Sequence, residues 1–175
     1  NTSCVEVAAD GWMLVLDAGS GIQGLNSSAN VKNSRIDILL THLHMDHIQG
    51  LGFFGPLFNP VTEVHIWGPA GNSQSLRARL GRYFSPPLFP VYFRNITSKL
   101  ILHEIERTSF TIGPFTIQSD YVIHPGPTLG FRIQHPRGVF TYIPDHEFAL
   151  ACNVKKAKDI RWLSGSELAA GADLL

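Results

Sequence analysis

The sequence predicts a mixed α/β fold built on β-sheets. Short runs of apolar and β-branched residues recur along the chain, and glycine, proline or other turn residues separate them. Histidine and aspartate residues stand directly after several of these runs. One stretch at 74–83 has helical character, after a possible cap at 71–73. Together these observations favour a sheet scaffold that offers a polar site at the ends of its strands.

The N-terminal part contains four predicted strands, at 3–8, 12–16, 36–40 and 64–67. Asp10-Gly11 is a hairpin turn signal between the first two. The second strand runs into a glycine-rich turn that begins with Asp17. This position suits a functional carboxylate, and equally a turn or helix-cap aspartate.

Three histidines and one aspartate follow the third predicted strand. His42 and His44 alternate in an extended segment, so both side chains can point at one metal ion. Asp46 and His47 come after the turn and can reach a second ion. Imidazole and carboxylate ligands without thiolate suit Zn, Mn or Fe. A lone histidine is usually an ordinary core or surface residue, but this spacing indicates a metal site.

The C-terminal part is β-rich. Strands are predicted at 100–105, 109–112, 115–123, 128–134 and 139–143. His124 ends one of them, and Asp145-His146-Glu147 follows another, so both places can contribute to a site at strand ends. Ser164 or Ser166 is expected to cap a short helix that runs to residue 170.

Other features have more ordinary interpretations. The glycine-rich aromatic stretch 51–58 could form a cleft wall, or could simply pack aromatic rings into the core. His65 and His103 are expected to be structural, because each lies within a predicted strand. The basic residues of the predicted helix are expected on a solvated face, and these are Arg77, Arg79 and Arg82.

Length and composition limit the classes of protein to which the chain can belong. With 175 residues, 44% of them hydrophobic and 16% charged, the chain is expected to form a single domain over 1–175. Its 14 basic and 14 acidic residues balance, which gives no support for a long nucleic-acid footprint. Two cysteines and no apolar run of membrane-spanning length favour a reduced, cytoplasmic protein. Both ends look clipped, so we expect a fragment.

The order of Asp17, the His-x-His-x-Asp-His cluster, His124 and Asp145 resembles the metallo-β-lactamase superfamily. Its phosphodiesterase branch, with cyclic-phosphate phosphodiesterases and tRNA 3′-processing nucleases, matches best. The segments that carry this resemblance are 1–4, 15–19, 44–50 and 142–147. The resemblance implies a four-layer αββα sandwich with the metal ions at one edge of the sheets.

The resemblance also implies a ligand set. His42, His44 and His124 would hold one ion, and Asp145 would bridge it to a second. Asp46 and His47 would hold the second ion with a further histidine, for which the chain offers no candidate after His146. Asp17 would orient a ligand imidazole. The residues with implied catalytic roles are Asp46, Asp145 and, indirectly, Asp17.

The activity implied is that of a metallo-hydrolase with two divalent ions, zinc before manganese or iron. A hydroxide that bridges the ions would attack a small or cyclic phosphodiester. The alternatives are a tRNA 3′-end endonuclease, a glyoxalase-II-like thioester hydrolase and a non-catalytic binding or regulatory module. Nucleic acid is the less favoured partner, because no glycine- and proline-rich basic arm occurs. No membrane partner is expected, and a clipped edge strand would permit a homodimer.

Overall fold

The computed structural model describes residues 1–27, 35–147 and 164–175 of the chain. These residues form two compact units, Asn1–Glu104 and Ile105–Leu175. The single domain predicted over the whole chain stays a prediction. No helix in the described ranges is both long and apolar enough to span a membrane.

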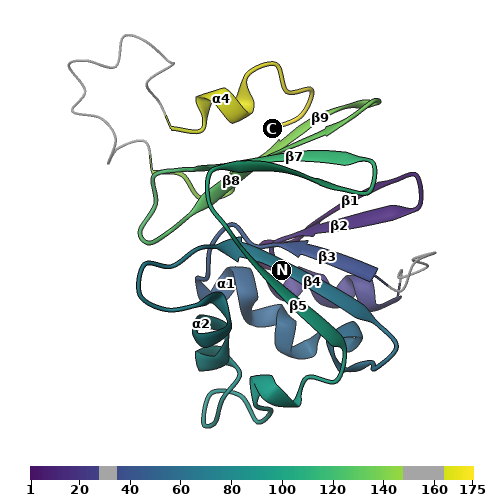
Figure 1. The fold of residues 1–175 in the computed structure, drawn as a ribbon, viewed down its shortest axis with the longest axis vertical. Coiled ribbons are helices and arrows are strands. Elements are labelled where there is room, and N and C mark those ends of the chain that lie inside the picture. The colour runs from purple at the N-terminus through teal and green to yellow at the C-terminus, as the bar shows by residue number, and fades with distance from the viewer. Residues whose placement is uncertain (28–34, 148–163) are drawn as a thin grey trace. The chain divides into compact units, whose positions relative to one another are not determined.

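A five-stranded sheet with the strand order β1-β2-β3-β4-β5 forms the base of the first unit (Figure 1). Its strands are β1 Val5–Ala9, β2 Trp12–Leu16, β3 Arg35–Leu39, β4 Glu63–Pro69 and β5 Lys99–Ile105. β1 pairs antiparallel with β2, whereas β2, β3 and β4 run parallel. The carboxyl ends of β2 and β3 therefore meet at one edge, and the metal-site motifs follow both strands.

The hairpin predicted between the first two strands is confirmed. Asp10 and Gly11 have φ angles of 51° and 82°, the left-handed pair that a tight turn between twisted strands requires. Aspartate tolerates this conformation better than most non-glycine residues do.

One face of the first sheet packs against short helices. The helical elements are η1 Ser20–Ser27, α1 Met45–Ile48, η2 Gln49–Phe53, η3 Gly55–Phe58, α2 Leu76–Tyr83 and η4 Phe93–Asn95, where η marks a 3₁₀ helix. Ile36, Ile38 and Ile66 of the sheet share a core with Phe54 and Leu80 of these helices. Ser75, rather than a residue of 71–73, caps α2, since its side chain accepts a hydrogen bond from Ala78 N.

The second unit contains a four-stranded antiparallel sheet in the order β6-β7-β8-β9. Its strands are β6 Thr108–Ile112, β7 Phe115–Tyr121, β8 Leu129–His135 and β9 Gly138–Tyr142. Phe115, Ile117, Phe131 and Ile133 are buried. Because β7 and β9 both lie antiparallel to β8, their carboxyl ends share one edge, and the predicted site residues of this unit follow that edge.

The short helix α4, Ser166–Ala169, also belongs to the second unit. The expected serine cap is wrong: Gly165, with φ 81°, occupies the cap position and no side chain caps the helix. Thr141 Oγ1 and Arg132 Nη1 instead donate to Leu168 O at 2.7 Å each. These bonds attach α4 to the sheet.

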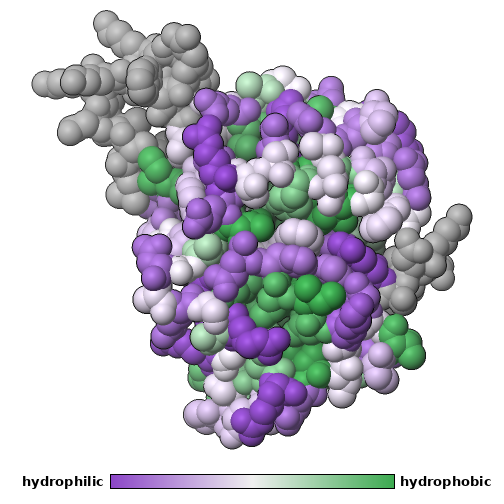
Figure 2. Space-filling model, viewed as in Figure 1, coloured by the Kyte–Doolittle hydropathy of each residue, from purple (hydrophilic) through white to green (hydrophobic). Residues whose placement is uncertain are grey.

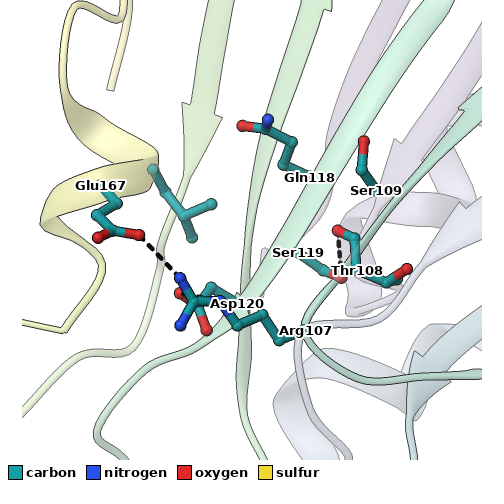
Figure 3. A pocket seen from close by; sticks show the side chains of 8 residues that line it. Arg107, Thr108, Ser109, Gln118, Ser119, Asp120 and Glu167 are labelled. Atoms are coloured by element: carbon teal, nitrogen blue, oxygen red, sulfur yellow. Dashed lines mark hydrogen bonds and ion pairs between the residues drawn. The ribbon is translucent and has the colours of Figure 1, made fainter.

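A shallow pocket of about 280 Å³ lies beside α4 (Figure 3). Arg107 reaches across it to Glu167 Oε2 at 2.9 Å and to Asp120 Oδ2 at 3.5 Å. None of the predicted site residues lines this pocket. Its ion pairs are exposed and link α4 to β7, so we assign them a structural role.

Candidate metal centre

Asp17 is the most constrained carboxylate of the first unit. It follows β2, is fully buried, and has the left-handed φ of 58°. A non-glycine residue is held there only when its surroundings determine it. Its Oδ1 accepts hydrogen bonds from Thr41 N at 2.7 Å and from Thr41 Oγ1 at 3.0 Å. Asp17 is therefore bonded across the fold to Thr41 and not only within its own turn.

The other oxygen of Asp17 orients an imidazole. Oδ2 lies 2.7 Å from His47 Nδ1, and His47 is fully buried. Since the carboxylate accepts, His47 Nδ1 carries the hydrogen and the lone pair is on Nε2. Burial raises the pKa of Asp17, while the hydrogen bonds from His47 and Thr41 oppose that rise. The arrangement matches the role that the family resemblance implied for Asp17.

Close backbone packing brings these segments together. Ala18 N donates to His47 O at 2.7 Å, and Gly50 N donates to Ala18 O at 2.9 Å. A Cβ on Gly50 would lie 2.1 Å from Gly19 O, and one on Gly19 would lie 2.3 Å from Asp46 O. Only glycine fits at either position. The two glycine-containing motifs therefore form one interlocked pair of loops.

His42 and His44 form a convergent pair after β3. His42 Nδ1 lies 3.0 Å from Thr41 Oγ1, whose hydrogen is donated to Asp17. Thr41 therefore accepts from His42 Nδ1, and the lone pair of His42 is on Nε2. That atom lies 2.9 Å from His44 Nδ1. Two imidazole nitrogens so close together fit a shared metal ion, as the alternation of the sequence predicted.

Asp46 and His47 present a second pair of donor atoms. Asp46 Oδ2 lies 3.5 Å from His47 Nε2, and its side chain is 56% exposed. Ser3 Oγ is 3.4 Å from the same nitrogen. The structure thus brings together Asp17, His42, His44, Asp46 and His47, all within the first unit.

The predicted residues of the second unit also meet one another. His124 follows β7 and Asp145 follows β9, with 3.6 Å between His124 Nε2 and Asp145 Oδ2. Glu147 Oε1 lies 3.2 Å from His124 Nδ1, close enough for an ion pair but without the hydrogen-bond geometry that joins Asp17 to His47. His146 turns to Ser164, with 2.6 Å between Nε2 and Oγ, and burial lowers its pKa.

The contacts of three further residues were not predicted from the sequence, although Glu147 was among the polar residues expected at a strand end. Thr41 links Asp17 to His42, and Glu147 contacts His124. Thr2 joins the two loops, because its Oγ1 accepts from Gln49 Nε2 and from Ser20 N, at 2.8 Å each. These contacts join residues that are far apart in the sequence. No short sequence pattern indicates such a contact.

Cys4 does not join the metal donors. It is a free, half-buried thiol, and burial together with the charges of Asp17 and Glu6 raises its pKa to about 11. A thiol rather than a thiolate therefore stands at this position near neutral pH. Cys152 lies outside the described residues.

The opposite face of the first sheet carries a separate polar cluster. Asp37 is buried and binds Arg35 through both oxygens at 2.8 Å, and it also accepts from Trp67 Nε1 at 2.9 Å. His65 Nδ1 lies 2.8 Å from His103 Nε2, and His65 Nε2 lies 2.7 Å from Glu63 Oε1. These contacts agree with the structural role predicted for both histidines.

Residues 12–164 match the family model of the beta-lactamase superfamily domain. The chain therefore belongs to this family, as the order of its histidines and aspartates indicated. The matched span includes every predicted site residue and enters both units. The donor set fits the binding of divalent metal ions.

Several curated relatives carry the name Ribonuclease Z. The chain is 34% identical over 125 residues to the protein from Nanoarchaeum equitans, covering 69% of this chain and 37% of that one. It is 29% identical over 146 residues to the protein from Thermococcus gammatolerans, covering 80% and 44%. The chain thus spans less than half the length of these two relatives.

Solved structures share the fold. The metallo-beta-lactamase fold protein YhfI from Bacillus subtilis has a TM-score of 0.61 at 20% identity, covering 86% of this chain and 58% of that one. Human tRNase Z, short form, has a TM-score of 0.58 at 22% identity, covering 83% and 62%. A diphosphatase from the PhnP family has a TM-score of 0.59 at 21% identity, covering 82% and 54%. The predicted α/β fold of the metallo-β-lactamase type is confirmed.

Proposed function

We propose that this chain carries the metal-binding residues of a metal-dependent phosphodiesterase. The observation that carries the proposal is the hydrogen-bonded series from Asp17 through Thr41 to His42, which leaves His42 Nε2 facing His44 Nδ1 at 2.9 Å. The names of the relatives support a phosphodiester as the substrate.

His42, His44 and His124 would hold one ion, and Asp46 and His47 would hold part of a second site, with Asp145 between them. Two divalent ions would supply a nucleophile near neutral pH and stabilise the charge that develops on the phosphoryl oxygens. Zinc is the ion proposed first, since imidazoles predominate among the donors.

The chain's own residues hold this geometry. Asp17 keeps His47 in the tautomer that leaves Nε2 available, and Thr41 does the same for His42. Glu147 would act on His124 in the same way. Such outer contacts fix the orientation and basicity of a ligand imidazole.

A small or cyclic phosphodiester is the substrate predicted from the sequence. RNA is the second candidate, because the curated relatives carry the name Ribonuclease Z. Comparing turnover of a 2′,3′-cyclic nucleotide with cleavage of an RNA strand separates the two. A thioester hydrolase would instead act on an acyl thioester and would leave both phosphodiesters intact.

The test combines metal content with hydrolysis of bis(p-nitrophenyl) phosphate. The wild-type protein should bind zinc and hydrolyse this substrate, and His44→Ala should lose at least 100-fold of the activity. His135→Ala is the matched control, because His135 lies at the end of β8, where it accepts a hydrogen bond from Arg137 N and contacts the ring of Phe115. A folded wild-type protein that takes up no metal would contradict the proposal.

A further inference from the structure

Charge is distributed unevenly in this electrically balanced chain. Between Val64 and His103 every Lys, Arg, Asp or Glu residue is basic, whereas the whole chain has 14 basic and 14 acidic residues. The basic residues of this segment are Arg77, Arg79, Arg82, Arg94 and Lys99. A net charge of zero therefore conceals a local positive region.

Two of these basic residues are already committed to contacts within the fold. Lys99 Nζ pairs with Glu63 Oε2 at 2.7 Å, and Arg79 donates to Pro69 O. Arg77, Arg82 and Arg94 are exposed, and within the described parts of the chain no ion pair is formed by them. These three guanidinium groups are available to a ligand.

Two of the available arginines lie on aromatic rings. The guanidinium carbon of Arg94 lies 4.3 Å from the centroid of Tyr92, and that of Arg77 lies 5.3 Å from the centroid of Phe93. Tyr92 is 40% exposed and Phe93 is buried. Stacking restricts both guanidinium groups before a ligand arrives. We call Arg77, Tyr92 and Arg94 the arginine–aromatic surface.

This surface is fixed to the loop that follows the metal-binding residues. Phe93 N donates to Phe84 O at 3.1 Å, which joins η4 to the end of α2. Tyr83 OH at that end donates to Gln49 O at 2.7 Å. Phe89 contacts Phe53, which is 61% exposed, with 5.9 Å between ring centroids. Ile48 of α1 and Leu80 of α2 belong to one core cluster of the first unit, whose helices are labelled in Figure 1.

Apolar side chains are also exposed near these arginines in the chain. Leu88 is 70% exposed, within the proline-rich stretch 85–90 that precedes η4. The space-filling view shows hydrophobic residues on the first unit with hydrophilic ones around them (Figure 2). One acidic group, Glu104, lies near the start of α2, where it accepts from Leu76 N at 3.0 Å.

We propose that the arginine–aromatic surface of α2 and η4 binds a single-stranded segment of the RNA substrate. Guanidinium groups pair with phosphates, and aromatic and guanidinium planes stack on unpaired bases. This inference rests on the proposed phosphodiesterase function and names its substrate class. Arg77 and Arg82 are exposed as predicted, whereas Arg79 is partly buried and bonded to Pro69 O; in this proposal Arg82 is a flanking charge.

Binding is measured by fluorescence anisotropy of a labelled 20-nucleotide single-stranded RNA, with EDTA present so that the metal centre contributes nothing. Arg77→Ala/Arg94→Ala should bind roughly 20-fold more weakly at 0.1 M salt, because each phosphate contact on a single strand contributes about 0.7 to the salt slope. The slope of log K against log salt should fall by about 1.4 for the same reason.

Arg107→Ala/Arg137→Ala is the charge-matched control, since it also removes two exposed positive charges, both in the second unit; because Arg107 pairs with Asp120 and Glu167, the melting temperature of this variant is measured alongside. An equal loss in this control, or no loss in Arg77→Ala/Arg94→Ala, overturns the proposal. Arg77→Gln/Arg94→Gln must reproduce the loss, which guards against altered packing in the alanine variant. Arg77→Lys/Arg94→Lys should keep the salt slope but bind more weakly, because stacking is lost.

Competition decides the class of ligand. Polyglutamate that displaces the RNA as well as unlabelled RNA does, at equal charge, would show a general site for acidic chains and overturn the proposal. Hydrolysis of bis(p-nitrophenyl) phosphate should be unchanged in Arg77→Ala/Arg94→Ala. If the wild type fails to hydrolyse that substrate but binds RNA as described, the proposed function fails and the surface stands.

Discussion

The two histidine–carboxylate pairs differ in how firmly the fold holds them. In the first unit Asp17 and His47 are fully buried, and Thr41 donates to the carboxylate through both its amide and its hydroxyl. In the second unit Glu147 and Asp145 are 43% and 32% exposed, and each contacts His124 at more than 3 Å. The first pair is preorganised by its protein surroundings, whereas the second pair is expected to depend more on a bound ion.

The largest effect is expected from breaking the loop contact that holds the first pair. In Gly50→Ala the new Cβ would lie 2.1 Å from Gly19 O and 2.5 Å from Ile22 Cγ2. We expect a loss of about 3 kcal/mol in the free energy of unfolding, the upper end for overpacking. Thermal unfolding measures it, with Gly24→Ala as control because nothing lies within 4 Å of a Cβ there. Equal melting temperatures for the two variants would contradict the interlocked loops.

The next effect tests the orienting carboxylates directly. Asp17→Asn keeps a side chain that tolerates the left-handed φ of 58° but removes the charge that faces His47. Zinc affinity, measured by competition with a chelating dye, should fall roughly 10- to 100-fold. Glu147→Gln should lose less than about threefold, since its carboxylate is more exposed. A larger loss in Glu147→Gln would reverse the comparison.

Two buried threonines, one in each unit, allow the stability of the two units to be compared in the metal-free protein. Thr41→Val removes a hydroxyl that contacts both oxygens of Asp17 and the imidazole of His42, so we expect a loss of about 2 kcal/mol. Thr141→Val in the second unit removes one bond to Leu168 O and should cost about 1 kcal/mol. Urea unfolding of the metal-free proteins measures both. Equal losses would show that Thr41 is an ordinary buried hydroxyl.

The smallest effect concerns the polar cluster on the first sheet. Hydrogen bonds from His65 and then Lys99 lower the pKa of Glu63 from its ordinary 4.5 to about 2. A carboxyl group with a depressed pKa stabilises the fold above its unfolded value, and that stabilisation is lost as the pH falls through the folded value. The melting temperature of the wild type should therefore exceed that of Glu63→Gln at pH 6, and the difference should shrink between pH 4.5 and pH 2. A difference that stays constant over this range would contradict the assignment.

Much of this arrangement could be predicted from the sequence, because strands and turns have local signals. The strand at 12–16 and the hairpin at Asp10-Gly11 were found by alternation and turn chemistry. The convergence of His42 and His44 was predicted from their spacing. The stretch 51–58 buries Leu51, Phe54 and Leu57, in agreement with the core-packing alternative given for it. Its 3₁₀ helices, η2 and η3, were not predicted, because such short turns have no periodic pattern.

The contacts between the carboxylates and the histidines could not be predicted, since they join residues far apart in the chain. The pairing of Asp17 with His47 rather than another histidine depends on the parallel register of β2 and β3. The role of Glu147 depends on β7 and β9 sharing an edge. Neither register nor edge is encoded in a short motif.

The contact between Gly19 and Gly50 limits how the protein can change in evolution. The atom that a side chain on Gly50 would meet first is a main-chain oxygen, and every amino acid has that oxygen. No second substitution that trims a neighbouring side chain could relieve the clash. In a saturation screen both positions should tolerate glycine alone, and a search for second-site suppressors of Gly50→Ala should recover revertants to glycine.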